Sequence, residues 1–137
     1  MLSKKRPGRH PRSGTVYYWS LAALFASALV LAALRLQQDY PLLILGSISF
    51  ASASLGRAAR RRLWRNWANL HISGMGLSYI AMLTAFYVDN GKNLPLWRDL
   101  PHLTYWLLPA AIGIPFILRA LLRYRKGKYP DPTREYA

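Results

Sequence analysis

The sequence predicts an all-α fold, an integral membrane bundle of four transmembrane helices. Three observations predict it. The chain has 137 residues, of which 53% are hydrophobic, yet its net charge is +14. Its basic residues gather in three clusters, and long apolar runs lie between the clusters. A water-soluble domain of this size has too little interior to bury those runs, so lipid is the expected solvent.

The start of the chain predicts a basic tail followed by a first span. Residues 1–16 are rich in Arg, Lys, Pro and Gly, a composition typical of a disordered or surface-bound tail. Tyr17, Tyr18 and Trp19 then open a span over residues 17–34, because amphipathic aromatic residues are frequent at the lipid interface. This apolar run is long enough to span, and further spans follow, so we expect an uncleaved anchor rather than a signal peptide.

A second span is expected over residues 41–59, after a short loop. Pro41 suits a helix start, where its missing N–H would have no partner anyway. The span ends in a run of arginines with interleaved tryptophans. This pattern predicts a cytoplasmic boundary that contacts anionic lipid headgroups rather than nucleic acid. The arginines assigned to lipid headgroups are Arg57, Arg60, Arg61, Arg62 and Arg65.

A third span is expected over residues 70–88. It should stop at residues 89–91, Asp-Asn-Gly, because these residue types favour turns and left-handed backbone. Residues 92–101 should form an interfacial loop that holds the indole of Trp97 at headgroup depth.

The fourth span is expected over residues 102–122, before a basic cytoplasmic tail over residues 123–137. Pro109, Gly113 and Pro115 fall inside this span. They predict a kinked helix whose freed carbonyl groups are satisfied by neighbouring helices.

The distribution of Lys and Arg predicts the orientation. If the N-terminus is cytoplasmic, 16 of the 19 Lys and Arg residues lie on the cytoplasmic side and three on the other. All three basic clusters agree with this orientation. The expected location is therefore the bacterial inner membrane, with several passes and both termini in the cytoplasm.

Histidines are the candidates for cofactor binding, because imidazole ligates haem or a chlorin magnesium. His10 lies in the tail. His71 and Met75, one turn apart, should share one end of the third span, and His102 should lie at the opposite membrane face. The two membrane histidines are then roughly 25 to 30 Å apart along the helices, which excludes one haem ligated by both. The alternative is that His71 is an interface histidine hydrogen-bonded to a neighbouring group.

Two faces of the third span have different compositions. One face is small, polar or soft and is expected to face protein, as close helix packing or as a pocket for a cofactor, quinone or lipid. The other is expected to face lipid and carries Leu77, Ile80, Ala81 and Thr84. The first face comprises His71, Gly74, Met75, Ser78, Met82, Ala85 and Asp89.

The second span carries a stripe of small residues, including Gly56, at spacings of three and four. Such stripes let helix backbones approach closely in lipid. The residues assigned to helix packing are Gly46, Ser49, Ala53, Gly74 and Ser78.

Enzyme signatures are missing from the sequence. The chain has no cysteine, which excludes disulfides and cysteine-ligated metals. No catalytic Ser, His and acid pattern, metal-ligand pair, phosphate-binding loop or dinucleotide motif is present, so we expect no enzymatic activity. None of the acidic residues is central to a span, which argues against a channel or carrier.

Four strings in the second half of the chain are distinctive together: HISGMGLSY from His71, TAFYVDNG from Thr84, LPLW from Leu94 and YWLLP from Tyr105. In these strings the chain resembles a family of uncharacterised small bacterial integral membrane proteins with four spans. The resemblance covers His71 to Arg123. It implies the topology and a bacterial origin, and it implies no activity.

The expectation ranked first is a small accessory or structural subunit of a larger bacterial membrane complex. Anionic lipids of the cytoplasmic face and other membrane subunits are the expected partners, and nucleic acid is not. The first alternative is a redox or pigment protein that binds haem, quinone or chlorin. The second alternative is a small transporter. The sequence identifies no particular cofactor.

Overall fold

The computed structural model describes residues 9–34 and 40–125 and confirms the all-α fold with four long helices. No strand occurs among these residues. The third and fourth helices are joined by a short 3-10 turn, η1, over Gly91–Asn93. The four helices are α1 (Arg9–Leu34), α2 (Tyr40–Arg61), α3 (Trp67–Asn90) and α4 (His102–Arg125).

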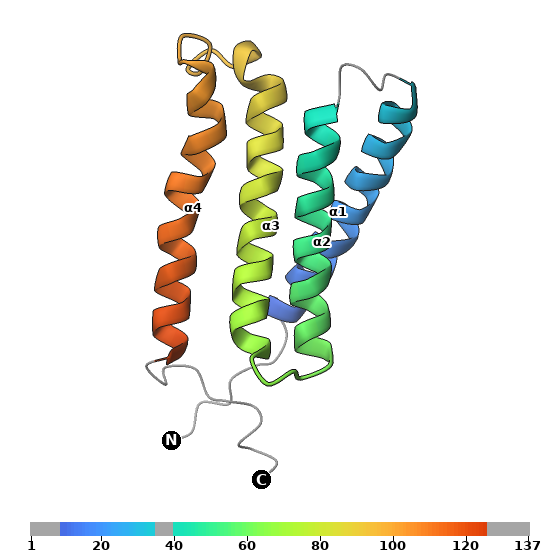
Figure 1. Ribbon diagram of the computed structural model, residues 1–137, viewed down its shortest axis with the longest axis vertical. Coiled ribbons are helices and arrows are strands. Elements are labelled where there is room, and N and C mark those ends of the chain that lie inside the picture. Colours follow the sequence, from blue (N-terminus) through green and yellow to red (C-terminus); the bar gives the residue numbers. More distant parts are fainter. Residues whose placement is uncertain (1–8, 35–39, 126–137) are drawn as a thin grey trace.

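The helices alternate in direction and lie side by side in chain order (Figure 1). The contact between α2 and α3 is the most extensive, followed by that between α3 and α4, whereas α1 packs on α2 over a shorter stretch. In Figure 1, α1 crosses α2 at an angle and diverges from it toward its own C-terminal end. We call the end where α2 stops and α3 starts the basic end; α1 begins there and α4 finishes there.

All four helices are long and apolar enough to cross a membrane. Their outer surface is apolar: Leu24 is 59% exposed, Leu107 57% and Phe116 67%. Their interior is made mostly of small residues, with alanine at five of the eight buried hydrophobic positions. Large aliphatic side chains outside and small ones inside are the arrangement expected when lipid, and not water, surrounds the helices.

The helices extend beyond the apolar segments expected from the sequence. Residues 9–16, which were expected to belong to the basic tail, are helical and belong to α1. Proline is tolerated in the first turn of a helix, and Pro11 lies in the first turn of α1. The other helices are also longer than their apolar runs, since a helix can continue into the polar interface. His10 lies within α1, and the residues before Arg9 and after Arg125 fall outside the described part of the chain.

The contact between α2 and α3 is a close approach of two backbones. A Cβ added to Gly74 would lie 2.7 Å from the carbonyl oxygen of Ser52 and 3.0 Å from the Cα of Gly56. A Cβ added to Gly56 would lie 3.3 Å from the carbonyl oxygen of His71. Only glycine leaves the space that this crossing needs, and the short distance lets dispersion forces act along both helices.

Buried hydroxyl groups join three helices near this crossing. Ser49 of α2 donates a hydrogen bond to the backbone oxygen of Ser78 in α3, at 2.8 Å. Tyr17 of α1 forms a hydrogen bond of 2.9 Å with the side chain of Ser78. Among the described residues, no buried side-chain nitrogen or oxygen lacks a hydrogen-bond partner. Since unsatisfied polar groups are costly in hydrocarbon, this network favours one register of α1, α2 and α3.

The contact between α3 and α4 is reciprocal. Ile117 of α4 packs on Gly76 of α3, and Ile80 of α3 packs on Gly113 of α4. Each glycine provides the hollow that the isoleucine of the opposite helix occupies. α4 remains helical through Pro109 and Pro115.

This contact corrects the sequence-based assignment of the two faces of α3. Ile80, Ala81 and Thr84 were expected to face lipid, but all three are buried. The expectation is correct for Leu77, which is 48% exposed. α3 packs on α2 along one side and on α4 along the other, so two sides of this helix are covered by protein.

The connection from α3 to α4 packs around Tyr105. The Tyr105 side chain is 1% exposed and donates a 2.7 Å hydrogen bond to the backbone oxygen of Trp97. A Cβ on Gly91 would lie 2.9 Å from the Tyr105 ring. α3 ends at Asn90, within the expected stop at residues 89–91, but the backbone of Gly91 is right-handed. Gly91 therefore fits a close approach and not a left-handed turn.

Substitution of Gly74 should reveal how much the α2–α3 crossing contributes to stability. We expect Gly74→Ala to lower the free energy of unfolding by about 1 to 3 kcal/mol, because the added methyl group meets the backbone of α2. Gly14→Ala is the matched control, since a Cβ there meets nothing within 4 Å. Thermal unfolding of both variants in one detergent measures the difference. Equal melting temperatures for Gly74→Ala and the unmodified chain would contradict this account of the crossing.

Candidate functional site

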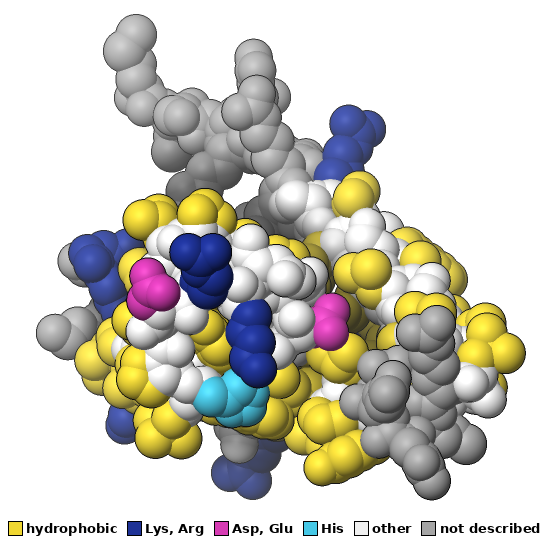
Figure 2. Space-filling model, turned by 90° about the horizontal axis from the view of Figure 1, so that it is seen from above, with side chains coloured by type: hydrophobic (Ala, Val, Ile, Leu, Met, Phe, Trp, Pro, Cys, Tyr) yellow, Lys and Arg dark blue, Asp and Glu magenta, His cyan; other side chains and the backbone are white. Residues whose placement is uncertain are grey.

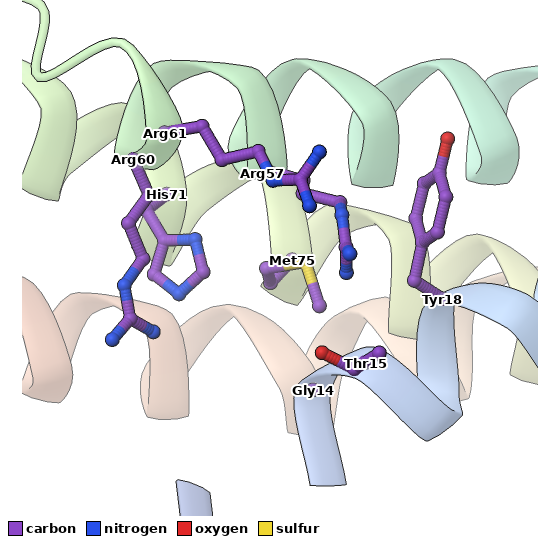
Figure 3. Close-up of a pocket in the computed structure, with 8 residues that line it drawn as sticks. All are labelled: Gly14, Thr15, Tyr18, Arg57, Arg60, Arg61, His71 and Met75. Atoms are coloured by element: carbon purple, nitrogen blue, oxygen red, sulfur yellow. The ribbon is translucent and has the colours of Figure 1, made fainter. Parts of the chain in front are cut away.

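A pocket of about 380 Å³ lies at the basic end, between the start of α1, the end of α2 and the start of α3 (Figure 3). We call it the basic pocket. Its volume falls within the range of small-molecule sites, roughly 300 to 1,000 Å³. The residues that line it are Gly14, Thr15, Tyr18, Arg57, Arg60, Arg61, His71 and Met75.

Three arginines of α2 provide the positive charge of this pocket. Arg57, Arg60 and Arg61 are spaced by three and four residues, which places them on one face of the helix. Figure 3 shows Arg57 and Arg61 extending over Met75 toward α1, and Arg60 beside His71. None of the described residues that line the pocket is acidic. The five arginines expected to contact lipid therefore fall into two groups, because Arg57, Arg60 and Arg61 line the pocket and Arg62 and Arg65 do not.

The position of Arg57 is set by an aromatic side chain of α1. Its guanidinium carbon lies 4.7 Å from the centre of the Tyr18 ring. The Tyr18 hydroxyl group forms a 3.2 Å hydrogen bond with Ser54, and its ring stacks on Phe50 at 5.7 Å between ring centres. A cation placed over an aromatic face in this way is attracted by the ring and still has N–H groups to donate.

His71 forms the wall of the pocket on the α3 side. Its Nδ1 atom lies 3.0 Å from the backbone oxygen of Gly56. A carbonyl oxygen only accepts hydrogen bonds, so Nδ1 is the donor, and this contact orients the imidazole ring. This hydrogen bond to α2 agrees with the sequence-based alternative of an interface histidine bonded to a neighbouring group. Met75, one turn further along α3, lies beside it in the same pocket.

His102, the other cofactor candidate, lies at the opposite end of the bundle. It begins α4, is exposed, and its ring contacts Tyr105 edge to face at 5.9 Å between centres. Figure 2 looks onto this end and shows basic and acidic side chains mixed among polar and hydrophobic ones. The structure thus brings His71 and Met75 together and separates both from His102.

A second concave region, the α1–α3 groove, lies where α1 diverges from α2 and α3. Its volume is about 550 Å³ and its lining is mainly apolar. Ser49 lies within it, and Asp89 and Asn90 supply polar groups at the end away from the basic pocket. The residues that line the groove are Leu21, Leu24, Phe25, Ala28, Leu42, Gly46, Ser49, Met82, Leu83, Ala85, Phe86, Asp89 and Asn90.

The residues assigned to helix packing lie between helices. Ser49, Ala53, Gly74 and Ser78 are buried at the α2–α3 contact. A Cβ on Gly46 would lie 3.3 Å from the ring of Phe25, so this glycine lies against α1 instead.

Comparison of the chain with models of protein families, with functionally characterised proteins and with solved structures finds no match. The functional argument therefore rests on the geometry of the chain itself. Within the described residues, no group of three or more His, Asp or Glu side chains is placed to hold a metal ion. The chemistry that the basic pocket offers is the binding of an anion by guanidinium groups.

Sequence analysis missed the contribution of α1 to this pocket. Gly14 and Thr15 were assigned to the tail, and Tyr18 was assigned only to the lipid interface. The arginine spacing of three and four was the available signal for a shared face. No sequence pattern shows that this face lies opposite Tyr18, because that depends on the register of α1 against α2.

The separation of the two histidines predicts the optical spectrum of the purified chain. We expect no low-spin haem band from a single copy, because His71 and His102 are about 28 Å apart along the helix axis at the usual rise per residue. The absorption spectrum of the protein purified from haem-replete cells tests this expectation. A low-spin Soret band that disappears on His71→Ala and on His102→Ala would contradict the observed arrangement.

Proposed function

We propose that this chain is a small, non-catalytic structural subunit of a larger bacterial membrane assembly. The observation that carries the proposal is the α1–α3 groove. It is an apolar concavity among helices, and several small side chains line it, including Ala28, Gly46 and Ala85. Small residues let the side chains and backbone of another helix approach closely, which drives helix association in lipid. A transmembrane helix of a partner subunit is the proposed occupant.

The divergence of α1 supports this occupant. α2 and α3 are held together by backbone contact, whereas α1 meets them mainly through Tyr17, Tyr18 and Phe25 near its middle and start. The side of α1 from Leu21 to Ala28 lines the α1–α3 groove. Asp89 and Asn90, at one end of the groove, can form hydrogen bonds to polar groups of a partner at the membrane surface.

The proposed orientation places the basic end and both termini in the cytoplasm of a bacterial cell, at the inner membrane. Its support is the distribution of charge along the helices. The last turns of α2 and the connection that follows carry five arginines between Arg57 and Arg65, whereas the connection between α3 and α4 carries Lys92 and Arg98 as its basic residues, near Asp89 and Asp99. Short loops with excess Lys and Arg remain on the cytoplasmic side during insertion.

A second candidate function is favoured by the same groove. An apolar channel with polar groups at one end also fits a lipid-soluble cofactor such as a quinone, whose head would accept hydrogen bonds from Asn90. Asn90 already donates to the Phe86 backbone oxygen at 3.2 Å, which leaves its amide limited capacity. The partner helix is the better fit, because its occupancy does not depend on that amide.

Matched single-cysteine variants test the orientation. The chain has no cysteine of its own, and Asn66 and Asn93 are exposed in the two connections at opposite ends. In intact cells, Asn93→Cys should react with a membrane-impermeant thiol reagent, whereas Asn66→Cys should react only after permeabilisation. Labelling is read as a mass shift of the protein. The reverse pattern would show that the basic end faces outward.

Matched alanine variants of α1 test the groove. Ala28→Leu places a larger side chain in the groove, whereas Ala26→Leu places one on an exposed position of the same helix. We expect Ala28→Leu to reduce the recovery of a co-purifying membrane subunit by about tenfold, the effect of losing roughly 1.4 kcal/mol of binding free energy. Ala26→Leu should leave recovery unchanged.

The same purification distinguishes the two candidates. Each preparation is made in a mild detergent, the accompanying chains are identified by mass spectrometry, and lipid-soluble molecules are extracted and analysed. Equal recovery of the partner chain with both variants would exclude the groove as its binding site. Loss of a bound quinone from Ala28→Leu, with no partner chain in any preparation, would replace the subunit proposal by the second candidate.

A further inference from the structure

We propose that the basic pocket is a binding site for a phosphate group, carried either by an anionic phospholipid or by a soluble phosphate. The proposal is independent of the subunit role, because the pocket and the α1–α3 groove share no lining residue. It also separates three arginines that bind from two that do not, a distinction that a general attraction of basic loops to lipid does not make.

The positive charge of the pocket indicates that its ligand is an anion. Arg57, Arg60 and Arg61 bring three permanent positive charges to one concavity, and no acidic residue is among its described lining. Guanidinium groups present several N–H donors in a plane, and phosphate oxygens accept such pairs of hydrogen bonds. A group with several oxygens and at least one negative charge is the ligand that matches these donors.

The pocket lies at the depth expected for phospholipid headgroups. It lies in the last turns of α2, where the apolar span gives way to the arginine-rich connection. Next to the arginines, the pocket is also lined by Met75 and the ring of Tyr18. A phospholipid bound there would place its phosphate oxygens on the guanidinium groups and its glycerol carbons against apolar side chains.

Part of the pocket, around Arg57 and His71, is organised before any ligand enters. Tyr18 fixes Arg57 from one side, and the hydrogen bond to Ser54 fixes Tyr18 in turn. His71 is oriented by the Gly56 backbone, which the close α2–α3 crossing holds in place. Side chains that are already positioned lose less conformational entropy on binding, which favours affinity.

The start of α1 leaves the pocket accessible. Gly14 has no side chain, and a Cβ at this position would meet no atom within 4 Å. Gly14→Phe therefore adds bulk at the wall of the pocket without a change in charge. This variant distinguishes a site of defined shape from a non-specific electrostatic attraction. A neutral side chain would weaken binding to the first and would leave the second unchanged.

Titration calorimetry on the full chain in a neutral maltoside detergent tests the proposal. The two ligands are inorganic phosphate and short-chain phosphatidylglycerol, with short-chain phosphatidylcholine as the neutral comparison. The pocket variant is Arg57→Gln with Arg60→Gln, and the matched control is Arg62→Gln with Arg65→Gln, which removes the same charge outside the pocket. Thermal unfolding of each variant in the same detergent shows whether it is folded.

We expect phosphatidylglycerol to bind the unmodified chain and to bind the pocket variant at least tenfold more weakly, because charge-assisted hydrogen bonds are lost. The control variant should stay within about twofold, and Gly14→Phe should weaken binding without any change in charge. If inorganic phosphate binds with the same dependence on these residues, the site is supported and a soluble phosphate is its source.

Two results would overturn the proposal. The first is equal weakening by the pocket variant and the control variant, which would show that charge near the surface attracts the lipid without a defined site. The second is the absence of binding of either ligand to the unmodified chain. If the pocket variant fails to fold, Gly14→Phe and the single variant Arg61→Gln, an exposed position, decide the question.

Discussion

The structure depends on one close contact, the crossing of α2 and α3 at Gly56 and Gly74. Lipid removes the hydrophobic effect as a force between helices, so packing and hydrogen bonding must hold them together. Two glycines allow the backbones to touch, and the touching backbones bring Ser49 within 2.8 Å of the carbonyl oxygen of Ser78. The glycines supply the space for this approach, and the serines favour one register of the two helices.

Both candidate sites are consequences of this crossing. Because α2 and α3 meet most closely near Gly56, the arginines of the last turns of α2 lie beside the first turns of α3, where His71 points toward them. α1 then fits against the pair through Tyr17 and Tyr18. Its angle to α2 closes the basic pocket at one end and opens the α1–α3 groove at the other.

The sequence was sufficient for the fold class and the number of helices, because long apolar runs bounded by charge have few other solutions. It was insufficient for helix ends and for the faces of α3. Ile80 appeared suited to lipid by its residue type, but the hollow above Gly113 receives it. Hydropathy does not distinguish an isoleucine in lipid from one seated on a glycine, since both surroundings are apolar. Only the pairing of the helices determines which of the two surroundings Ile80 has.

The same reasoning explains why the basic pocket was only half visible in the sequence. The spacing of Arg57, Arg60 and Arg61 shows that they share a face of α2, and their number suggests contact with anionic lipid. The partner of that face depends on the register of α1, which is fixed by hydrogen bonds of Tyr17 and Tyr18 to serines far along the chain. In this chain two of the three aromatic residues expected at the lipid interface also face the interior, where Tyr17 joins the serine network and Tyr18 holds an arginine. Interfacial tyrosines next to a basic loop are therefore candidates for positioning residues as well as membrane anchors.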